Sequence, residues 1–205
     1  MKTEVLSADH PTAIAHANDV LRHGGLVAFP TDTVYGLAVL PNEEASVGRL
    51  YTVKGRNSQK AISILVGDVS QLKYVADQMG PIAMQLADRF WPGPLTLVVP
   101  RLPSLPPNLS PDPTIGVRMP DHPIALALLR YVGPLAVTSA NLSGQANANT
   151  AQEVLAQLKG RIHLLLDGGP TPGGVPSTVV DCTGTDLALL RPGPISFDDV
   201  RSALR

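Results

Sequence analysis

The chain has 205 residues, 44% of them hydrophobic and 16% charged, a globular composition that argues against a disordered protein. Its formal net charge of −1 excludes a global positive field that would attract nucleic acid, so RNA binding would require a local cluster of Lys and Arg. We expect residues 1–205 to form a single domain, because the length does not demand two.

Cysteine usage and the lack of long apolar segments bear on where the protein works. Cys182 is the single cysteine, so the chain forms no internal disulfide and lacks the ligands of an ordinary zinc site. Residues 1–10 have no apolar core of signal-peptide length, and no window is long and apolar enough to span a membrane. These features predict a cytoplasmic protein without membrane contact.

Apolar runs alternate with helical patterns along the chain. Helices are expected at residues 11–24, 42–53, 69–75, 81–90, 123–131, 150–160 and from 197 onward, and strands at 26–29, 61–66, 95–99, 115–119, 135–137, 162–166, 179–181 and 187–190. Asn42, Thr150 and Ser196 are the expected N-caps, the last two followed by an acidic residue three positions later. The alternation predicts an α/β domain with a twisted, partly parallel mixed sheet flanked by helices.

Hydroxyl, amide and cationic side chains gather where several apolar elements end. These groups are the segment 31–35, the tripeptide 54–56, the segment 139–141, and Ser177 with Arg191. Ligands of open α/β sheets bind at the carboxyl ends of strands, and cations beside neutral hydrogen-bonding groups suit an anion. Taken alone, each group also has a structural explanation, because Lys54-Gly55-Arg56 can simply end a helix and the hydroxyls can cap turns.

Arg118 adds a charge inside an otherwise apolar strand pattern. A charge is seldom buried there without an anionic partner, which a bound ligand could supply. Asp32 stands alone as a carboxylate near the suspected site, so a reaction that needs paired carboxylates is disfavoured. P-loop, GxGxxG, nucleophile-elbow and HExxH motifs do not occur, and the five histidines are dispersed, so we expect no metal site built from protein ligands.

Six motifs follow one another along most of the chain. They are FPTDTVYGL at 29–37, KGR at 54–56, VRMP at 117–120, SANLSG at 139–144, PSTVVD at 176–181 and LRPG at 190–193. In this order they resemble the motifs of the YrdC-like family, the L-threonylcarbamoyladenylate synthases. The resemblance implies one YrdC-like α/β domain with a large concave face. Longer family members carry a further C-terminal domain, and with its last residue at Arg205 this sequence resembles the short form.

The resemblance also implies an activity. Members of the family are nucleotidyltransferases that make threonylcarbamoyl-AMP and pyrophosphate from L-threonine, bicarbonate and ATP, with Mg²⁺ on the phosphates. The product feeds biosynthesis of N6-threonylcarbamoyladenosine in tRNA, which a separate transferase completes. Transient contact with tRNA or with a transferase complex is therefore an expectation as well.

Roles for individual residues follow from the family motifs. The catalytic residues would be Lys54 and Arg56. ATP would be held by Arg56, Lys60, Thr114, Asn141, Asn149 and Arg191. Threonine would be held by Thr33, Arg118, Ser139 and Ser177, and the pocket would be lined by Thr31 and Tyr35. Two positions depart from the family pattern: Asn149 stands where relatives often have threonine, and Leu65 where some have a polar contact, so Leu65 is not assigned to the site.

Two other functions remain as hypotheses. One is an RNA-binding module that uses the concave face without catalysis. The other is a related carbamoyl-adenylating enzyme with a different substrate. The Gly- and Pro-rich loop 168–176 is, by composition, a candidate for closing over a nucleotide.

Overall fold

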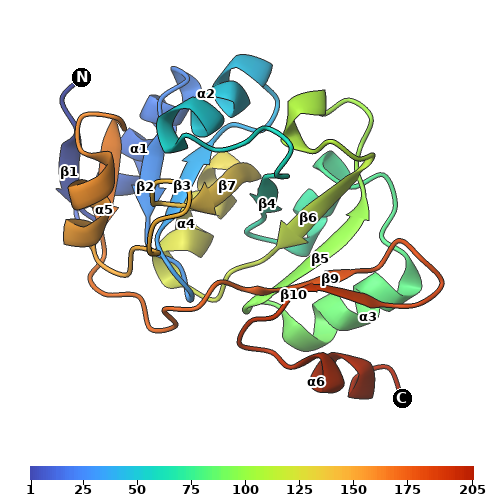
Figure 1. Ribbon diagram of the computed structural model, residues 1–205. Coiled ribbons are helices and arrows are strands. Elements are labelled where there is room, and N and C mark those ends of the chain that lie inside the picture. Colours follow the sequence, from blue (N-terminus) through green and yellow to red (C-terminus); the bar gives the residue numbers. More distant parts are fainter.

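A ten-stranded mixed sheet runs through the molecule, which the computed structural model describes over residues 1–205 (Figure 1). The strands are β1 (Glu4–Ser7), β2 (Val27–Phe29), β3 (Gly36–Val39), β4 (Ser63–Leu65), β5 (Leu95–Pro100), β6 (Thr114–Arg118), β7 (Leu135–Ser139), β8 (Leu164–Asp167), β9 (Thr178–Asp181) and β10 (Ala188–Arg191). Their order in the sheet is β1-β8-β2-β3-β7-β4-β6-β5-β9-β10. Parallel pairs such as β4 with β6 occur beside antiparallel pairs such as β3 with β7, which confirms the predicted mixed sheet.

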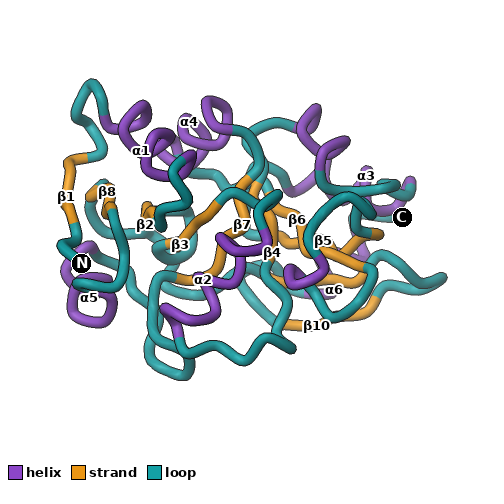
Figure 2. Tube along the Cα trace, turned by 90° about the horizontal axis from the view of Figure 1, so that it is seen from above, coloured by secondary structure: helices purple, strands orange, loops and turns teal.

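Helices cover both faces of the sheet. They are α1 (Ala13–Arg22), α2 (Glu44–Lys54), α3 (Pro81–Phe90), α4 (Pro123–Val132), α5 (Ala151–Leu158) and α6 (Phe197–Ser202), with short 3₁₀ helices at Val69–Tyr74 and Pro107–Leu109. Figure 2 shows α1 and α4 together on one side of the strands and α2 and α5 on the other. No helix has the length and apolar character needed to cross a membrane.

The sheet separates two apolar cores of unequal size. The larger, with 36 buried residues, includes side chains of α2, α3, α5 and α6, and the smaller, with 16, lies under α1 and α4. In β6 the alternation of a strand sends Ile115 and Val117 into the larger core. Thr114, Gly116 and Arg118 therefore face the opposite side, where α1 and α4 pack over β2, β3, β7 and β8. On this same side of the sheet, no helix covers β6, β5, β9 and β10. The site described below lies there.

The local structure differs from the sequence prediction in three places. Strand β1 is unpredicted because it is a largely exposed edge strand without an apolar run. Strand β3 is unpredicted because it continues directly from the polar segment 31–35. The prediction of Asn42 as an N-cap is wrong, because Glu43 takes that position and α2 begins without a side-chain cap. Thr150 and Ser196 are confirmed as caps, accepting from the backbone N–H of Glu153 and Asp199.

Candidate active site

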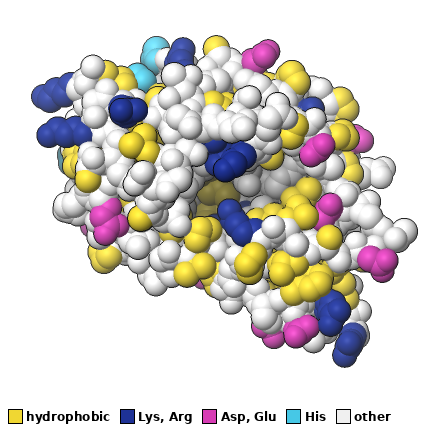
Figure 3. Space-filling view, in the orientation of Figure 1, with side chains coloured by type: hydrophobic (Ala, Val, Ile, Leu, Met, Phe, Trp, Pro, Cys, Tyr) yellow, Lys and Arg dark blue, Asp and Glu magenta, His cyan; other side chains and the backbone are white.

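A cavity of about 190 Å³ lies on the open face of the sheet, and the space-filling view shows a hollow in the middle of the molecule with dark blue Lys and Arg side chains beside it (Figure 3). It is lined by Thr31, Thr33, Val34, Tyr35, Gly36, Arg56, Ala61, Ser63, Leu65, Thr96, Arg118, Val137, Thr138, Ser139, Asn147, Pro176, Ser177 and Arg191. The lining combines hydroxyls and arginines and contains no carboxylate. Pockets that bury a whole drug-sized ligand measure roughly 300–1,000 Å³, so the enclosed part suits a smaller molecule, the size of an amino acid.

Arg118, at the end of β6, is the most deeply buried cation of the cavity, with a side chain only 7% exposed. It pairs with the carboxylate of Asp32, donates from Nη1 to Thr33 Oγ1 at 3.1 Å, and donates from Nε to the Gly93 carbonyl at 3.0 Å. Burial lowers the pKa of Arg118, and Asp32 opposes that shift. The predicted anionic partner was a ligand, whereas the structure supplies Asp32. A guanidinium has five N–H groups, so two remain for a ligand.

Arg56 enters the cavity from the end of α2. Gly55 adopts the left-handed conformation, with φ of 59°, and ends the helix, so the chain turns and Arg56 can reach the cavity. Its Nη2 donates to the Ala61 carbonyl at 2.9 Å, which fixes the guanidinium at the cavity wall. Both explanations of this tripeptide therefore hold, because it caps a helix and also delivers a cation.

Arg191, at the end of β10, also lines the cavity. Its Nε and Nη2 donate to the Ser177 carbonyl at 3.0 and 2.8 Å, and Nη2 also reaches Ser177 Oγ at 3.0 Å. Burial lowers the pKa of Arg191, and the charges of Arg118 and Arg56 lower it further. The other two guanidinium groups thus repel that of Arg191, and an anion bound among them would relieve the repulsion.

Hydroxyl groups fill the space between the cations. Thr33 and Thr31 are 1% and 3% exposed, and their hydroxyl oxygens lie 3.0 Å apart. Ser177 Oγ lies 2.7 Å from Thr96 Oγ1. The Tyr35 hydroxyl instead donates to the Gly169 carbonyl at 2.7 Å, and burial raises its pKa to about 12. Tyr35 therefore lines the cavity as expected, while its hydroxyl holds the loop 168–176.

The loop 168–176 is fastened along its length. Besides the Tyr35 contact, the Thr171 N–H donates to the Asn149 carbonyl and the Gly174 N–H donates to the Thr33 carbonyl, both at 2.8 Å. A Cβ on Gly173 would lie 2.7 Å from the Asp32 carbonyl oxygen, so only glycine fits this close approach. The loop is thus a wall next to the threonines of the cavity.

Lys54 is the predicted site residue whose position differs most from expectation. It is 2% exposed and does not line the cavity. Its Nζ contacts the carbonyl oxygens of Ser139 and Asn141 and the side chain of Asn141. A direct contact between Lys54 and a ligand in the cavity is therefore not supported by this geometry.

The structure divides the residues predicted to hold ATP. Arg56 and Arg191 line the cavity, whereas Lys60, Thr114, Asn141 and Asn149 do not. The Asn141 amide donates to the carbonyls of Leu142 and Gln145 at 3.0 and 2.8 Å, so it is engaged within the fold. Thr114 shares the open face of β6 with Arg118, and Lys60 is exposed in the loop after Arg56.

The predicted threonine-binding residues come together in full, since Thr33, Arg118, Ser139 and Ser177 all line the cavity. The sequence prediction missed the lining residues Ser63 and Thr96, and its exclusion of Leu65 from the site is wrong, because Leu65 also lines the cavity. Leu65 pairs with Arg118 in the β4–β6 ladder, which places the two side chains next to each other on one face. The family pattern already marked the position of Leu65, and strand alternation could have added Ser63 on the same face, whereas the pairing of Leu65 with Arg118 depends on the strand order.

The lining chemistry also bears on Mg²⁺. No three His, Cys, Asp or Glu residues are grouped so that they could hold a metal ion, and Asp32 is committed to Arg118. Mg²⁺ binds carboxylate, phosphate and water oxygens, and the cavity walls contain no carboxylate. The residues therefore do not form a resident Mg²⁺ site, and a Mg²⁺ ion would fit here only as part of a nucleotide substrate.

Comparison with known proteins places this site in a family. Residues 19–193 match the Sua5/YciO/YrdC family model, described as "Telomere recombination". The chain belongs to the Sua5/YciO/YrdC family. A family relative, the threonylcarbamoyl-AMP synthase of Bacillus subtilis (strain 168), is 43% identical over 98% of this chain and 59% of its own length. The enzyme of the same name from Pyrococcus abyssi (strain GE5 / Orsay) is 40% identical over 90% of this chain and 55% of its own length.

A solved structure within the Sua5/YciO/YrdC family has the same fold. It is that of P. abyssi Sua5 complexed with L-threonine, with a TM-score of 0.92 and 38% identity over 99% of this chain and 59% of that chain. The match confirms the predicted YrdC-like α/β fold. The chain spans 59% and 55% of the lengths of the two curated relatives.

Proposed function

We propose that the protein is an L-threonylcarbamoyladenylate synthase, a nucleotidyltransferase that makes threonylcarbamoyl-AMP and pyrophosphate from L-threonine, bicarbonate and ATP. The main observation behind the proposal is the cavity itself, in which Arg56, Arg118 and Arg191 converge among hydroxyl groups with no carboxylate in the lining. The names of the relatives and the threonine in the P. abyssi structure make this reaction the best match to such a site.

The proposed reaction explains why the site is cationic. The ammonium group of threonine first releases a proton to solvent. The neutral amine then attacks the carbon of bicarbonate, water leaves, and a carbamate forms. A carbamate oxygen then attacks the α-phosphorus of ATP, the bond to the bridging oxygen breaks, and pyrophosphate leaves. Bicarbonate, ATP and threonine with a neutral amine are all anions, so positive charge must offset both their mutual repulsion and the charge that develops on pyrophosphate.

Arg118 is suited to the carboxylate of threonine. It retains two N–H groups after its contacts with Asp32, Thr33 and Gly93, and a guanidinium can bind a carboxylate through two hydrogen bonds. The hydroxyls of Ser139 and Ser177 can accept from the amine or donate to the carbamate. Leu65, beside Arg118, offers an apolar surface for the methyl group of threonine.

Arg56 and Arg191 are suited to the phosphates of ATP. Both line the cavity, and both keep N–H groups that no protein atom accepts. Thr114 lies on the open face of β6, outside the cavity lining, and Lys60 is exposed in the loop after Arg56. In this arrangement the Mg²⁺ ion enters with ATP, bound to the phosphates.

Pyrophosphate release in the presence of L-threonine, bicarbonate and MgATP tests the function. We expect release to require all three, and mass spectrometry to detect threonylcarbamoyl-AMP. Release that is unchanged without threonine would reject the synthase. Release with carbamoyl phosphate in place of threonine and bicarbonate would instead support the related carbamoyl-adenylating enzyme.

The proposed role in biosynthesis of N6-threonylcarbamoyladenosine requires a transferase that passes the threonylcarbamoyl group to tRNA. We infer that contact with tRNA or with that transferase is transient and that the protein works in the cytoplasm, where a free thiol such as Cys182 persists. Binding of tRNA to the protein alone, measured at physiological salt with and without ATP, tests the alternative of an RNA-binding module. Tight binding without any pyrophosphate release would favour that alternative.

A further inference from the structure

Lys54 joins the end of α2 to the segment that follows β7. The 139–141 turn consists of Ser139, Ala140 and Asn141. Lys54 Nζ donates to the Ser139 carbonyl, to the Asn141 carbonyl at 2.5 Å, and to Asn141 Oδ1 at 3.3 Å. The Lys54 carbonyl in turn accepts from the Ser143 N–H at 2.8 Å. Lys54 therefore holds this turn through its side chain and holds Ser143, just after the turn, through its backbone.

The acceptors around Lys54 match a protonated amine. An ammonium group has three N–H donors and no acceptor, and three oxygen atoms surround this Nζ. No carboxylate forms an ion pair with Lys54. To reach a phosphate in the cavity, the amine would have to leave all three oxygens and expose buried carbonyls, which is costly.

The turn that Lys54 holds presents a hydroxyl to the cavity. Ser139 lines the cavity, and its Oγ donates to Asn141 Oδ1 at 2.5 Å. Asn141 Oδ1 is the same atom that Lys54 reaches, so the amine and the hydroxyl share one acceptor. The position of Asn141 Oδ1 thus determines where the Ser139 hydroxyl points.

We propose that Lys54 is a positioning residue, which fixes the 139–141 turn so that Ser139 Oγ faces the amino-acid substrate, and which does not itself bind the phosphates of ATP. Because the substrate is threonine, this role rests on the proposed function. It replaces the catalytic, phosphate-directed role expected for Lys54 from the sequence. Arg56, two residues away and within the cavity, keeps the role of the phosphate-binding cation.

Steady-state kinetics of Lys54→Met and Arg56→Met distinguish the two roles. Methionine matches the length of lysine but has no N–H donors. We expect Lys54→Met to raise the KM for threonine roughly tenfold, the effect of losing about one hydrogen bond, and to leave the KM for MgATP within about twofold. Arg56→Met should both raise the KM for MgATP and lower kcat, because its guanidinium would contact phosphate in the bound nucleotide and in the transition state. If Lys54→Met raises the KM for MgATP instead, Lys54 binds phosphate and the proposal is wrong.

A double-mutant cycle tests whether Lys54 acts through Ser139. If it does, adding Lys54→Met to Ser139→Ala should change the KM for threonine by less than about twofold, because the hydroxyl to be positioned is already gone. Independent, multiplying effects of the two substitutions would contradict the proposal. Should Lys54→Met fail to fold, Lys54→Gln, which keeps two N–H donors without the charge, should raise the KM for threonine less than tenfold and leave the KM for MgATP within about twofold.

Amide hydrogen exchange measures how firmly the 139–141 turn is held, and it does not depend on enzyme activity. We expect exchange across residues 139–143 to quicken at least tenfold in Lys54→Met and to stay unchanged in Arg56→Met. Unchanged exchange in Lys54→Met would overturn the proposal. If exchange quickens but pyrophosphate release in the unaltered protein does not depend on threonine, the proposed function fails while the role of Lys54 in holding the turn stands.

Discussion

Asp32 and Arg118 form a buried ion pair at the edge of the cavity, although 86 residues separate them in the chain. Their side chains are 10% and 7% exposed. Asp32 follows β2 and Arg118 ends β6, so the pair ties together two parts of the sheet. Asp32 Oδ2 is also buried and has no hydrogen-bond partner. Arg118 is therefore the main group that compensates the negative charge of this carboxylate.

We expect Asp32→Asn to destabilise the protein strongly. The substitution keeps the shape of the side chain but leaves the buried guanidinium of Arg118 without a counter-charge, and loss of one partner of a buried pair costs about 3–5 kcal/mol. Urea denaturation measures the change in the free energy of unfolding. If Asp32→Asn is as stable as the unaltered protein, Arg118 does not depend on Asp32 for charge compensation.

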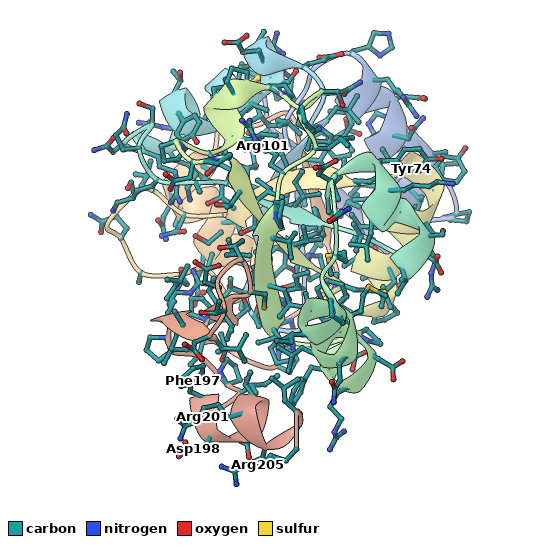
Figure 4. The ribbon with its side chains drawn as sticks, turned by 90° about the vertical axis from the view of Figure 1, so that its right-hand side faces the viewer. Tyr74, Arg101, Phe197, Asp198, Arg201 and Arg205 are labelled. Carbon is teal, nitrogen blue, oxygen red and sulfur yellow. The ribbon has the colours of Figure 1, made fainter.

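Asp198→Asn is the matched control for Asp32→Asn. Asp198 pairs with Arg201 at 3.2 Å, but these side chains are 87% and 58% exposed. Figure 4 shows both residues on α6, at the outer end of the molecule. An exposed pair contributes about 0–1 kcal/mol, so this substitution should hardly change stability.

Arg56→Ala should abolish most turnover with little effect on the fold. The guanidinium contacts only the carbonyls of Lys60 and Ala61, so its structural contribution is small. Loss of a group that stabilises transition-state charge costs about 10²–10³-fold in kcat. Pyrophosphate release and circular dichroism measure the two effects, and Arg201→Ala on α6 is the control. Turnover near that of the unaltered protein would show that Arg56 does not bind the reacting phosphates.

Lys54 should make stability depend on pH. Burial, with a smaller effect of Arg56, lowers its pKa from 10.5 to about 7. Between these values the unfolded chain binds more protons than the folded one, so the free energy of unfolding rises with pH. The penalty for the buried ammonium is complete below about pH 7 and fades toward pH 10.5.

Urea denaturation of the unaltered protein and of Lys54→Met from about pH 7 to about pH 9 isolates this contribution. The stability of the unaltered protein relative to Lys54→Met should increase by up to about 1.4 kcal/mol per pH unit. Cys182 and Tyr35, whose pKa values burial raises to about 12, remain in both proteins and cancel in the difference. Parallel pH profiles of the two proteins would mean that Lys54 does not titrate in this range.

The sequence predicts those parts of the site in which a local pattern determines the position. Thr33 and Ser139 come directly after or within apolar strands, so their place at strand ends follows from the chain alone. The direction of a long side chain does not follow in this way. Lys54 and Arg56 are neighbours in one motif, yet Gly55 turns the backbone between them, and one side chain is buried behind the cavity wall while the other lines it.

The pairing of strands is, after the direction of long side chains, the second feature that could not be predicted from the sequence. Leu65 has an ordinary apolar strand pattern, and it reaches the cavity because β4 pairs in parallel with β6, opposite Arg118. Likewise Asp32 becomes the partner of Arg118 only because β2 and β6 lie in one curved sheet. Such contacts depend on strand order and register, which local propensity does not encode.

Leu65→Ala should weaken the preference for threonine over serine. Leu65 is 5% exposed, lines the cavity and adjoins Arg118, so it is placed to contact the methyl group that distinguishes the two amino acids. One methyl contact in an apolar pocket is worth about 1–3 kcal/mol, and removal of its partner should reduce the ratio of kcat/KM values by about tenfold. Leu164→Ala is the control, because Leu164 is fully buried in the same core but lies on β8, outside the cavity lining. Both substitutions should cost about 2–5 kcal/mol of stability. If both change the preference equally, or neither does, Leu65 does not select the substrate.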